Sequence, residues 1–246
     1  MIPNYGDKYD AEALFSPEDA LRAYAGGVPE VPSAVILGFQ ASLTDLVASR
    51  AEASTPLGRE ELYRLPTGVG YVQSSVGAPV AAGTVENVIA GGAEVVCILG
   101  GAASLSADVA PDDAVLPTRA IRDEGVSYHY LPPDGTAEPS DPLVDALDAR
   151  LREAGVTTHR GPTWTTSAFY RETVPEVRQY AAEGVLTCEM EAAGVFAVAE
   201  YRGIEAAAVH EVGDYLLDEW DPGTEHGEAF DRLLDPVAGA LAAYVR

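Results

Sequence analysis

Positive charge is what this sequence most lacks. The 246 residues contain a single lysine, Lys8, and 15 lysines and arginines stand against 39 aspartates and glutamates, which gives a formal net charge of -24. Such a surface repels the phosphates of nucleic acids and the headgroups of anionic membranes. We therefore expect neither nucleic acid nor a membrane as a partner. The acids are spread along the whole chain, and an excess of this size leads us to expect a halophilic source.

Cysteines and long apolar runs are scarce as well. The two cysteines, Cys97 and Cys188, lie in apolar segments and have neither the spacing of a disulfide framework nor a metal-binding pattern with histidine. No segment approaches the roughly 18 apolar residues of a membrane span, and the N-terminus lacks the basic start and apolar run of a secretory signal. These absences predict a cytoplasmic protein without a bound metal.

What the sequence does have is an alternation of β-branched apolar runs with helix-like stretches. Hydrophobic residues make up 47% of the chain and no linker divides it, so we expect residues 1–246 to form a single domain with one large core. The alternation predicts an α/β layered fold with a mainly buried sheet. The expected strands lie at residues 33–39, 69–76, 94–100, 113–118, 155–161, 184–190 and 204–212.

The stretch TCEMEAAGVFAVAEYRGIEAAAVHEVGDY, residues 187–215, places two acids one residue apart directly before an apolar helix. A carboxylate in the first turn of a helix is stabilised by the helix dipole by about 0.3 to 1 kcal/mol, and one acid is enough for that. In an extended junction Glu189 and Glu191 point to the same side, while Met190 faces the other way. The pair therefore indicates either a helix start or a polar binding site.

Two glycine-rich turns follow predicted strands, SSVGAPVAAG at 74–83 and LGGAASL at 99–105. Neither has the spacing of a dinucleotide fingerprint or a P-loop, so no cofactor of these classes is expected. They are either tight turns or sites where backbone amides meet a ligand at the carboxyl ends of strands. The segment HEVGD, 210–214, lacks the second histidine of a zinc motif. Its last residue, Asp214, is either a turn residue or a general acid beside a polar pocket.

The segment WTTSAFYRET, residues 164–173, places aromatic rings among hydroxyl groups. The rings are either part of the core or a platform on which a nucleobase stacks. In the second case Arg171 and Glu172 would be able to hydrogen bond to the edge of the base. The segment alone does not separate the two interpretations.

These motifs, in this order, resemble the nucleoside phosphorylase and nucleosidase superfamily, which includes uridine phosphorylase, the hexameric purine nucleoside phosphorylases and methylthioadenosine nucleosidase. The resemblance extends from about Val31 to the C-terminus, and its most specific element is EMEAAGVFAVAEYRG, which looks like the family's ribose-binding segment. It implies a three-layer α/β/α fold around a mixed, partly barrel-like sheet. It also implies cleavage of an N-glycosidic bond through a transition state in which the sugar is cationic.

The resemblance further implies roles for individual residues. Glu191 would act in catalysis and hold the ribose hydroxyls through charge-assisted hydrogen bonds, with Glu189 and Met190 beside the sugar. Asp214 would give a proton to a purine leaving group. Base binding is implied for Phe169, which would stack on the base, and for Ser167 and Arg171.

The implied phosphate site departs from the family pattern. Gly38 keeps the family's glycine, but Ser42 and Ile98 stand where arginines are expected, and Gly101 replaces a threonine. Arg59 matches an arginine that relatives place in a neighbouring subunit's phosphate site. We therefore assign phosphate binding to Arg59, Gly38 and Gly101, and we expect a homo-oligomer built on a dimer, with a hexamer as the larger form.

The leading interpretation is a phosphorylase that cleaves a purine or uridine nucleoside, with phosphate as co-substrate and no further cofactor. Two alternatives stay open. One is a nucleosidase that uses water, although GFQASLTD offers no acid before Asp45 to activate it. The other is a nucleoside-binding protein with weak catalysis. The sequence does not name the base, and Asp214 favours purines over uracil.

Overall fold

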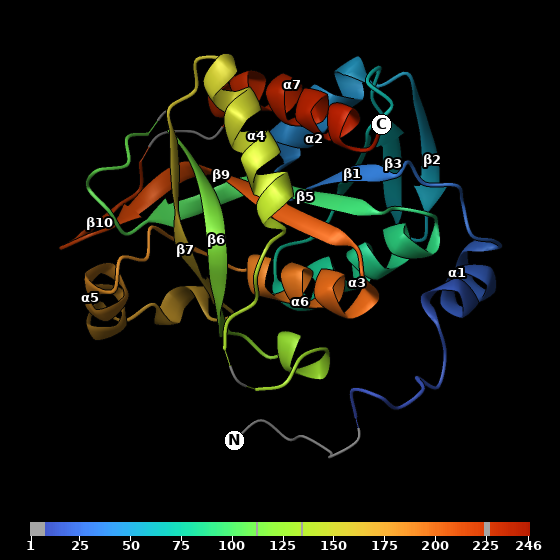
Figure 1. Ribbon diagram of the computed structural model, residues 1–246, viewed down its shortest axis with the longest axis horizontal. Coiled ribbons are helices and arrows are strands. Elements are labelled where there is room, and N and C mark those ends of the chain that lie inside the picture. Colours follow the sequence, from blue (N-terminus) through green and yellow to red (C-terminus); the bar gives the residue numbers. More distant parts are fainter. Residues whose placement is uncertain (1–7, 112, 134, 224–226) are drawn as a thin grey trace.

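Each of the seven expected strands is present, and all of them belong to one sheet. The computed structural model describes residues 8–111, 113–133, 135–223 and 227–246 (Figure 1). The strands are β1 (Ala34–Gly38), β2 (Ala53–Leu57), β3 (Glu60–Arg64), β4 (Gly70–Gln73), β5 (Val95–Ser104), β6 (Ala114–Asp123), β7 (Thr158–Thr166), β8 (Thr187–Glu189), β9 (Glu205–Leu216) and β10 (Trp220–Asp221). The helices are α1 (Pro17–Ala25), α2 (Ala41–Arg50), α3 (Ala78–Ala90), α4 (Asp141–Glu153), α5 (Val174–Ala182), α6 (Ala192–Arg202) and α7 (Gly227–Tyr244), with short 3-10 turns at Ser127–His129 and Phe169–Arg171.

Within the residues that the structure describes, no helix has the length and apolarity needed to cross a bilayer.

The sheet closes on itself at one end. The strand order is β10-β9-β6-β7-β8-β5-β1-β4-β3-β2, and β9 also pairs with β5. The strands β9, β6, β7, β8 and β5 therefore form a closed circuit, while β1, β4, β3 and β2 extend it as an open sheet. Parallel pairs such as β5 with β9 occur beside antiparallel pairs such as β5 with β8. The expected mixed, partly barrel-like sheet is thus confirmed.

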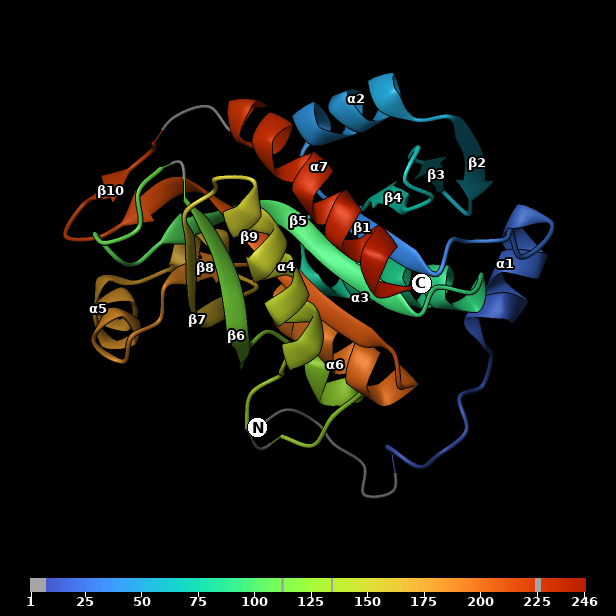
Figure 2. The ribbon, with the colours of Figure 1, turned by 45° about the horizontal axis from the view of Figure 1, so that its top comes forward.

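Two hydrophobic cores lie on the two faces of the sheet, because successive side chains of a strand point in opposite directions. In β1, Ile36 belongs to the core under α2, α4 and α7, whereas Val35 and Leu37 belong to the core under α1, α3 and α6. Figures 1 and 2 show the two groups of helices on opposite sides of the sheet. This confirms the three-layer fold and explains why the central strands read as continuous apolar runs.

Small residues bring α3 and α6 close together. A Cβ atom on Gly194 of α6 would lie 2.9 Å from the Cβ atom of Ala78 on α3, which is closer than real side chains approach. The two helices therefore start side by side, with Gly77 directly before α3 and Glu191 directly before α6. The small residues of α6 allow it to pack closely against α3. This packing brings Glu191 next to the start of α3.

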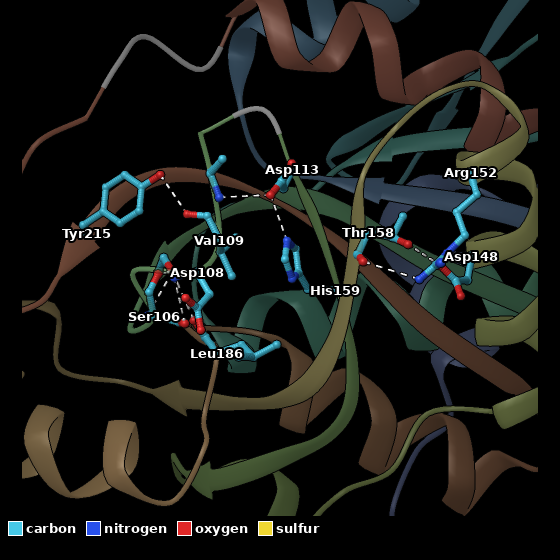
Figure 3. A network of polar contacts seen from close by, with 12 residues as sticks. Ser106, Asp108, Val109, Asp113, Asp148, Arg152, Thr158, His159, Leu186 and Tyr215 are labelled. Carbon is cyan, nitrogen blue, oxygen red and sulfur yellow. Dashed lines mark hydrogen bonds and ion pairs between the residues drawn. The ribbon is translucent and has the colours of Figure 1, made fainter.

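A polar network ties the segment between β5 and β6 to the end of β9 (Figure 3). The Tyr215 hydroxyl donates to the carbonyl oxygen of Val109 at 3.2 Å. Asp113 accepts a hydrogen bond at 3.0 Å from the backbone of the same segment and lies 2.8 Å from a ring nitrogen of His159 on β7. Because Tyr215 directly follows Asp214, this network fixes the strand end that carries the predicted acid.

Strands β2, β3 and β10 were not predicted, because their sequences lack an apolar pattern. In β2 every residue except Leu57 is exposed, and Pro56 is tolerated there because the strand lies at the edge of the sheet. Both residues of β10 are exposed as well. These strands form because they pair with a neighbouring strand. Such pairing leaves no pattern of buried residues in the sequence from which it could be predicted.

His210 is buried in the middle of β9 without a polar partner. It is 1% exposed and lies opposite Gly100 of β5 and Val115 of β6. Neither ring nitrogen has a hydrogen-bond partner in the part of the chain that the structure describes. Burial lowers the pKa of His210 to about 3, because the charged imidazolium would lose its hydration. The ring is therefore neutral when the chain is folded, and it acts as a core residue.

This histidine predicts a loss of stability in acid. The unfolded chain binds a proton on His210 near the ordinary pKa of 6.5, while the folded chain does not until about 3. The free energy of unfolding therefore falls as the pH drops through this window, by up to about 1.4 kcal/mol per pH unit. His210→Leu removes this linkage. In urea titrations at constant molar salt, the variant should gain stability relative to the wild type between about pH 6 and pH 4; a difference that does not change with pH would contradict the assignment.

Candidate active site

A cavity of about 330 Å³ lies at the ends of β1 and β5 and beside the first residues of α3 and α6. Its size is within the range of small-molecule sites. Six of the predicted site residues line it, namely Glu189, Met190, Glu191, Phe169, Asp214 and Gly101. The other lining residues are Phe39, Gln40, Val76, Ala102, Ala103, Glu172, Cys188, Trp220 and Pro222. The fold thus gathers segments that are far apart in the sequence into one site.

Glu189 uses its carboxylate to hold the start of α6. One oxygen accepts the backbone N–H groups of Glu191 and Ala192, each at 2.7 Å, and the other accepts the Thr165 hydroxyl at 2.5 Å. The Thr165 oxygen in turn accepts the N–H of Ala193 at 3.0 Å. Burial raises the pKa of Glu189, while these donors oppose the shift. Both oxygens are therefore engaged within the protein, which supports a structural role for Glu189 at the start of α6.

Glu191 presents its carboxylate at the start of α3 instead. It accepts the backbone N–H of Gly77 at 2.5 Å and is 7% exposed. Burial raises the pKa of Glu191, and the neighbouring Glu189 raises it further, because a second negative charge so close is unfavourable. A ligand that donates hydrogen bonds to Glu191 would oppose this shift and favour the ionised form. The two acids of the motif thus have different partners, one in α6 and one facing the cavity.

An irregularity in β9 aims Asp214 into the cavity. Val212 pairs with Ala102 and Asp214 pairs with Ala103, so Gly213 is an extra residue in β9. A bulge of this kind redirects the following side chain and is common beside active sites. The Asp214 carboxylate accepts the indole N–H of Trp220 at 2.9 Å. Trp220 was not predicted, because it lies on the two-residue strand β10 and its position depends on pairing with β9.

The aromatic segment before α5 divides between core and cavity. Trp164 is buried and packs against Tyr180, with ring centroids 4.8 Å apart, so this ring is a core residue. Phe169 lines the cavity and remains 56% exposed, as a stacking platform for a ligand requires. Ser167 and Arg171, predicted beside the base, are exposed and do not line the cavity. Phe169 and Arg171 belong to one 3-10 turn, in which successive side chains point in different directions, so they do not share one face.

Glu172 occupies the place in the cavity wall that was expected for Arg171. Its side chain lines the same cavity as Asp214 and Cys188. Burial, followed by the negative charge of Asp214, raises the pKa of Glu172 to about 7. The sequence shows the glutamate but not its surroundings, because Glu172, Cys188 and Asp214 come from three distant segments.

The predicted phosphate residues are not brought together within one chain. Gly101 lines the cavity, but Gly38 does not, and a Cβ atom there would lie 2.6 Å from the Tyr71 side chain. The glycine is thus required for packing. Arg59 is exposed between β2 and β3, beside a separate depression that it shares with Tyr24 and Asn87. No arginine, lysine or histidine is found among the described residues of the cavity wall, and no described cluster of acids, histidines and cysteines is suited to a metal ion.

Comparison with known proteins places these features in a family. The sequence profile of the phosphorylase superfamily matches residues 32–246. The chain is 29% identical to a guanosine phosphorylase from Halorubrum lacusprofundi over 204 residues, which are 80% of this chain and 85% of that protein. It is 26% identical to a uridine phosphorylase from Treponema pallidum over 192 residues, which are 71% of this chain and 74% of that protein.

Solved structures of similar shape belong to the same group of proteins. A purine nucleoside phosphorylase from Toxoplasma gondii, in complex with immucillin-H, superposes with a TM-score of 0.77 at 18% identity, covering 87% of this chain and 92% of its own. A uridine phosphorylase from Vibrio fischeri, complexed with 6-hydroxy-1-naphthoic acid, gives a TM-score of 0.73 at 18% identity, covering 88% and 93%. These similarities establish the three-layer fold.

The contacts of Glu189 predict a large effect on stability. Glu189→Ala leaves the Thr165 hydroxyl and two backbone N–H groups without an acceptor, so the free energy of unfolding should fall by about 2 kcal/mol or more. Thr165→Val should lower it by about 1 to 3 kcal/mol, because the Ala193 N–H loses its partner. Glu191→Gln is the matched control and should change it by less than about 1 kcal/mol. Urea titrations measure all three, and equal stability of Glu189→Ala and wild type would refute the capping role.

Proposed function

Because the chain belongs to the phosphorylase superfamily, we propose that it is a pentosyltransferase that cleaves the N-glycosidic bond of a nucleoside with phosphate as the nucleophile. The observation that carries the proposal is the cavity itself, whose wall contains both an acid at the start of a helix, Glu191, and an exposed aromatic ring, Phe169. A sugar and a flat base joined by one bond need these two kinds of contact at the two ends of one site.

The sugar end of the site is assigned to Glu191 and Met190. A carboxylate accepts two hydrogen bonds from adjacent ribose hydroxyls, and such charge-assisted bonds are stronger than neutral ones. As the glycosidic bond breaks, the sugar becomes cationic and its attraction to the carboxylate increases. Only this increase accelerates the reaction, since equal binding of substrate and transition state would not. Glu189 supports the arrangement by fixing the backbone N–H of Glu191.

The base end of the site is assigned to Phe169, with Trp220 and Asp214 at its edge. The exposed ring of Phe169 offers a face for stacking, and base–aromatic stacking is worth about 1 to 3 kcal/mol. Acidic side chains at the edge favour bases that carry N–H donors or take up a proton on leaving. We therefore propose a purine nucleoside as substrate, and the similarity to the Halorubrum guanosine phosphorylase makes guanosine the first one to test.

The phosphate end of the site is completed, in this proposal, by a second copy of the chain. The described wall near Gly101 provides backbone but no cation, and Arg59 lies away from the cavity of its own chain. An arginine is suited to a shared anion, because its planar fork binds oxyanions at two points and stays charged. We propose a homo-oligomer of at least two subunits, located in the cytoplasm of a salt-adapted cell, in which the partner subunit's Arg59 reaches this site.

The first test is phosphate-dependent release of the base. Purified protein in molar salt, offered guanosine, inosine, adenosine and uridine, should release base only when phosphate is present, and purine nucleosides should react fastest. Glu191→Gln should lower turnover by about 10² or more, because the neutral amide loses the attraction to the cationic sugar. Chromatography quantifies the free base, and an unfolding titration confirms that the variant is folded.

Each alternative gives a distinct result in the same assay. Release of base without phosphate would identify a nucleosidase that uses water. Binding of nucleosides without turnover would identify a binding protein. Full activity of a folded Glu191→Gln variant would show that Glu191 takes no part in the reaction and serves only at the start of the helix.

The shared site predicts complementation between two inactive variants. Arg59→Ala and Glu191→Gln should each be nearly inactive alone. In a mixed dimer one site contains both defects and the other contains none, so random pairing of co-expressed chains should restore about a quarter of wild-type activity. Separately purified variants that are mixed without subunit exchange are the control. If the co-expressed pair stays inactive, or if Arg59→Ala alone is fully active, Arg59 does not act across an interface.

A further inference from the structure

The strand end that carries Asp214 is held by the hairpin that follows it in the sequence. Strand β10 runs back along β9, so that Asp221 pairs with Tyr215 and Trp220 pairs with Leu216. Figure 1 shows β10 at the outer end of β9. The indole N–H of Trp220 donates to one carboxylate oxygen of Asp214, Oδ2, at 2.9 Å. The residues directly after this acid therefore return to contact its side chain.

The backbone of the hairpin contacts the bulge in β9 as well. Gly223 lies against Gly213, the extra residue of the bulge, and a Cβ atom on Gly223 would collide with the carbonyl oxygen of Gly213 and lie 3.2 Å from the Cα atom of Asp214. The φ angle of Gly223 is 66°, in the left-handed region that glycine adopts most easily. Its N–H donates to the Asp221 side chain at 3.0 Å. The hairpin thus contacts both the backbone and the carboxylate of Asp214.

The exposure of Trp220 separates it from an ordinary core residue. Its side chain is 65% exposed, whereas Trp164 is 1% exposed. A ring with so much of its surface in solvent gains little from burial. Trp220 also lines the cavity, as Asp214 does. The hydrogen bond between these two side chains therefore assigns Trp220 to the site and not to the core.

This hydrogen bond determines which oxygen of a protonated Asp214 carries the hydrogen. A carboxylic acid has one O–H donor, and its other oxygen is a carbonyl-type acceptor. Because the indole N–H uses Oδ2 as its acceptor, the proton belongs on Oδ1. The carboxyl is thereby fixed in rotation, and Oδ1 is the oxygen left for a ligand in the cavity.

We propose that Trp220 is a positioning residue for Asp214, and that its indole N–H orients the carboxyl so that the proton on Oδ1 is given to a departing purine base. The inference rests on the proposed phosphorolysis of a purine nucleoside with Asp214 as the acid. It adds to that function the residue that orients the acid, which the sequence analysis did not identify.

The step is balanced as follows. The bond between C1′ of the sugar and N9 of the purine breaks, and its electron pair goes to the base. The proton on Oδ1 of Asp214 moves to N7, while an oxygen of HPO₄²⁻ forms the new bond to C1′. The products are a neutral base, the carboxylate of Asp214 and a sugar phosphate that still carries one proton. Transfer of that proton back to Asp214 restores the acid, and Trp220 keeps its N–H throughout.

The test compares two substrates that differ in their need for a proton. Guanosine requires protonation at N7, whereas 7-methylguanosine carries a methyl group and a positive charge there and releases a neutral base without an acid. Trp220→Phe keeps a flat ring and removes the N–H, so it should lower kcat for guanosine by about 10-fold and change KM little. Turnover of 7-methylguanosine should stay within a few fold, which also shows that the variant is folded. Asp214→Asn should show the same preference with a larger loss, about 10² or more.

A second variant tests the N–H itself. In Trp220→His the Nε2 atom has the same place in a five-membered ring as the indole nitrogen and can carry a proton. This variant should recover most of the guanosine turnover that Trp220→Phe loses. Gly223→Ala should slow guanosine selectively as well, because the added Cβ atom pushes the hairpin away from Gly213. Leu217→Ala is the matched control, since Leu217 lies on the same hairpin, is 41% exposed and does not line the cavity; it should change neither substrate.

Three results would overturn the inference. If Trp220→Phe slows both substrates equally, Trp220 serves binding or folding and not the proton. If Trp220→His is as slow with guanosine as Trp220→Phe, the N–H is not responsible. If Trp220→Phe turns over guanosine like wild type, the contact has no role in the reaction. Each of these results, with phosphorolysis by wild type intact, refutes the inference alone. If wild type releases no base from any nucleoside, the proposed function fails, and the inference fails with it.

Discussion

The site depends on one buried carboxylate, that of Glu189, which joins β8, α6 and β7. Its oxygens hold two backbone N–H groups at the start of α6 and the hydroxyl of Thr165 on β7. This places α6 at the end of β8, and α6 in turn lies against α3 because Gly194 leaves room for Ala78. The position of the neighbouring acid follows from both contacts. In the proposed assignment Glu189 does not contact the substrate. Its contacts nevertheless determine the position of Glu191, which is proposed to hold the sugar.

An excess of negative charge distinguishes the cavity wall. The described wall carries four carboxyl groups and no cation, at Glu172, Glu189, Glu191 and Asp214. Burial raises the pKa of Glu172, Glu189 and Glu191, and a neighbouring carboxylate raises each further, namely Asp214 for Glu172, Glu124 for Glu189 and Glu189 for Glu191. Carboxylates in such a wall favour a ligand that carries or develops positive charge. Four carboxyl groups also disfavour a phosphate anion, which is the reason for proposing that an arginine from a second subunit holds that substrate.

The alternation of apolar runs predicted a layered α/β fold, and the order of the motifs predicted the family and, through the resemblance, the three layers and the mixed sheet. The sequence also placed Glu191, Phe169 and Asp214 in one cavity. What it could not provide was the surroundings of a residue. The raised pKa of Glu172 depends on its burial and on the charge of Asp214. Glu189 holds the start of α6 and the Thr165 hydroxyl together. Gly38 matched the family pattern, but the structure requires glycine there because any side chain would collide with the ring of Tyr71. Such roles depend on contacts between segments far apart in the sequence.

The closed circuit of strands has a consequence for how such an enzyme diverges. The sugar segment and the end of β9 belong to strands that each pair with neighbours on both sides, so a change there disturbs several ladders at once. The aromatic residues of the cavity wall, Phe169 and Trp220, lie instead on a short turn and on a two-residue edge strand. These pieces can be replaced or lengthened at little cost to the fold. With the base and the sugar bound as proposed, selection can change the choice of base by loop exchange, while the segment assigned to the pentose is inherited unchanged.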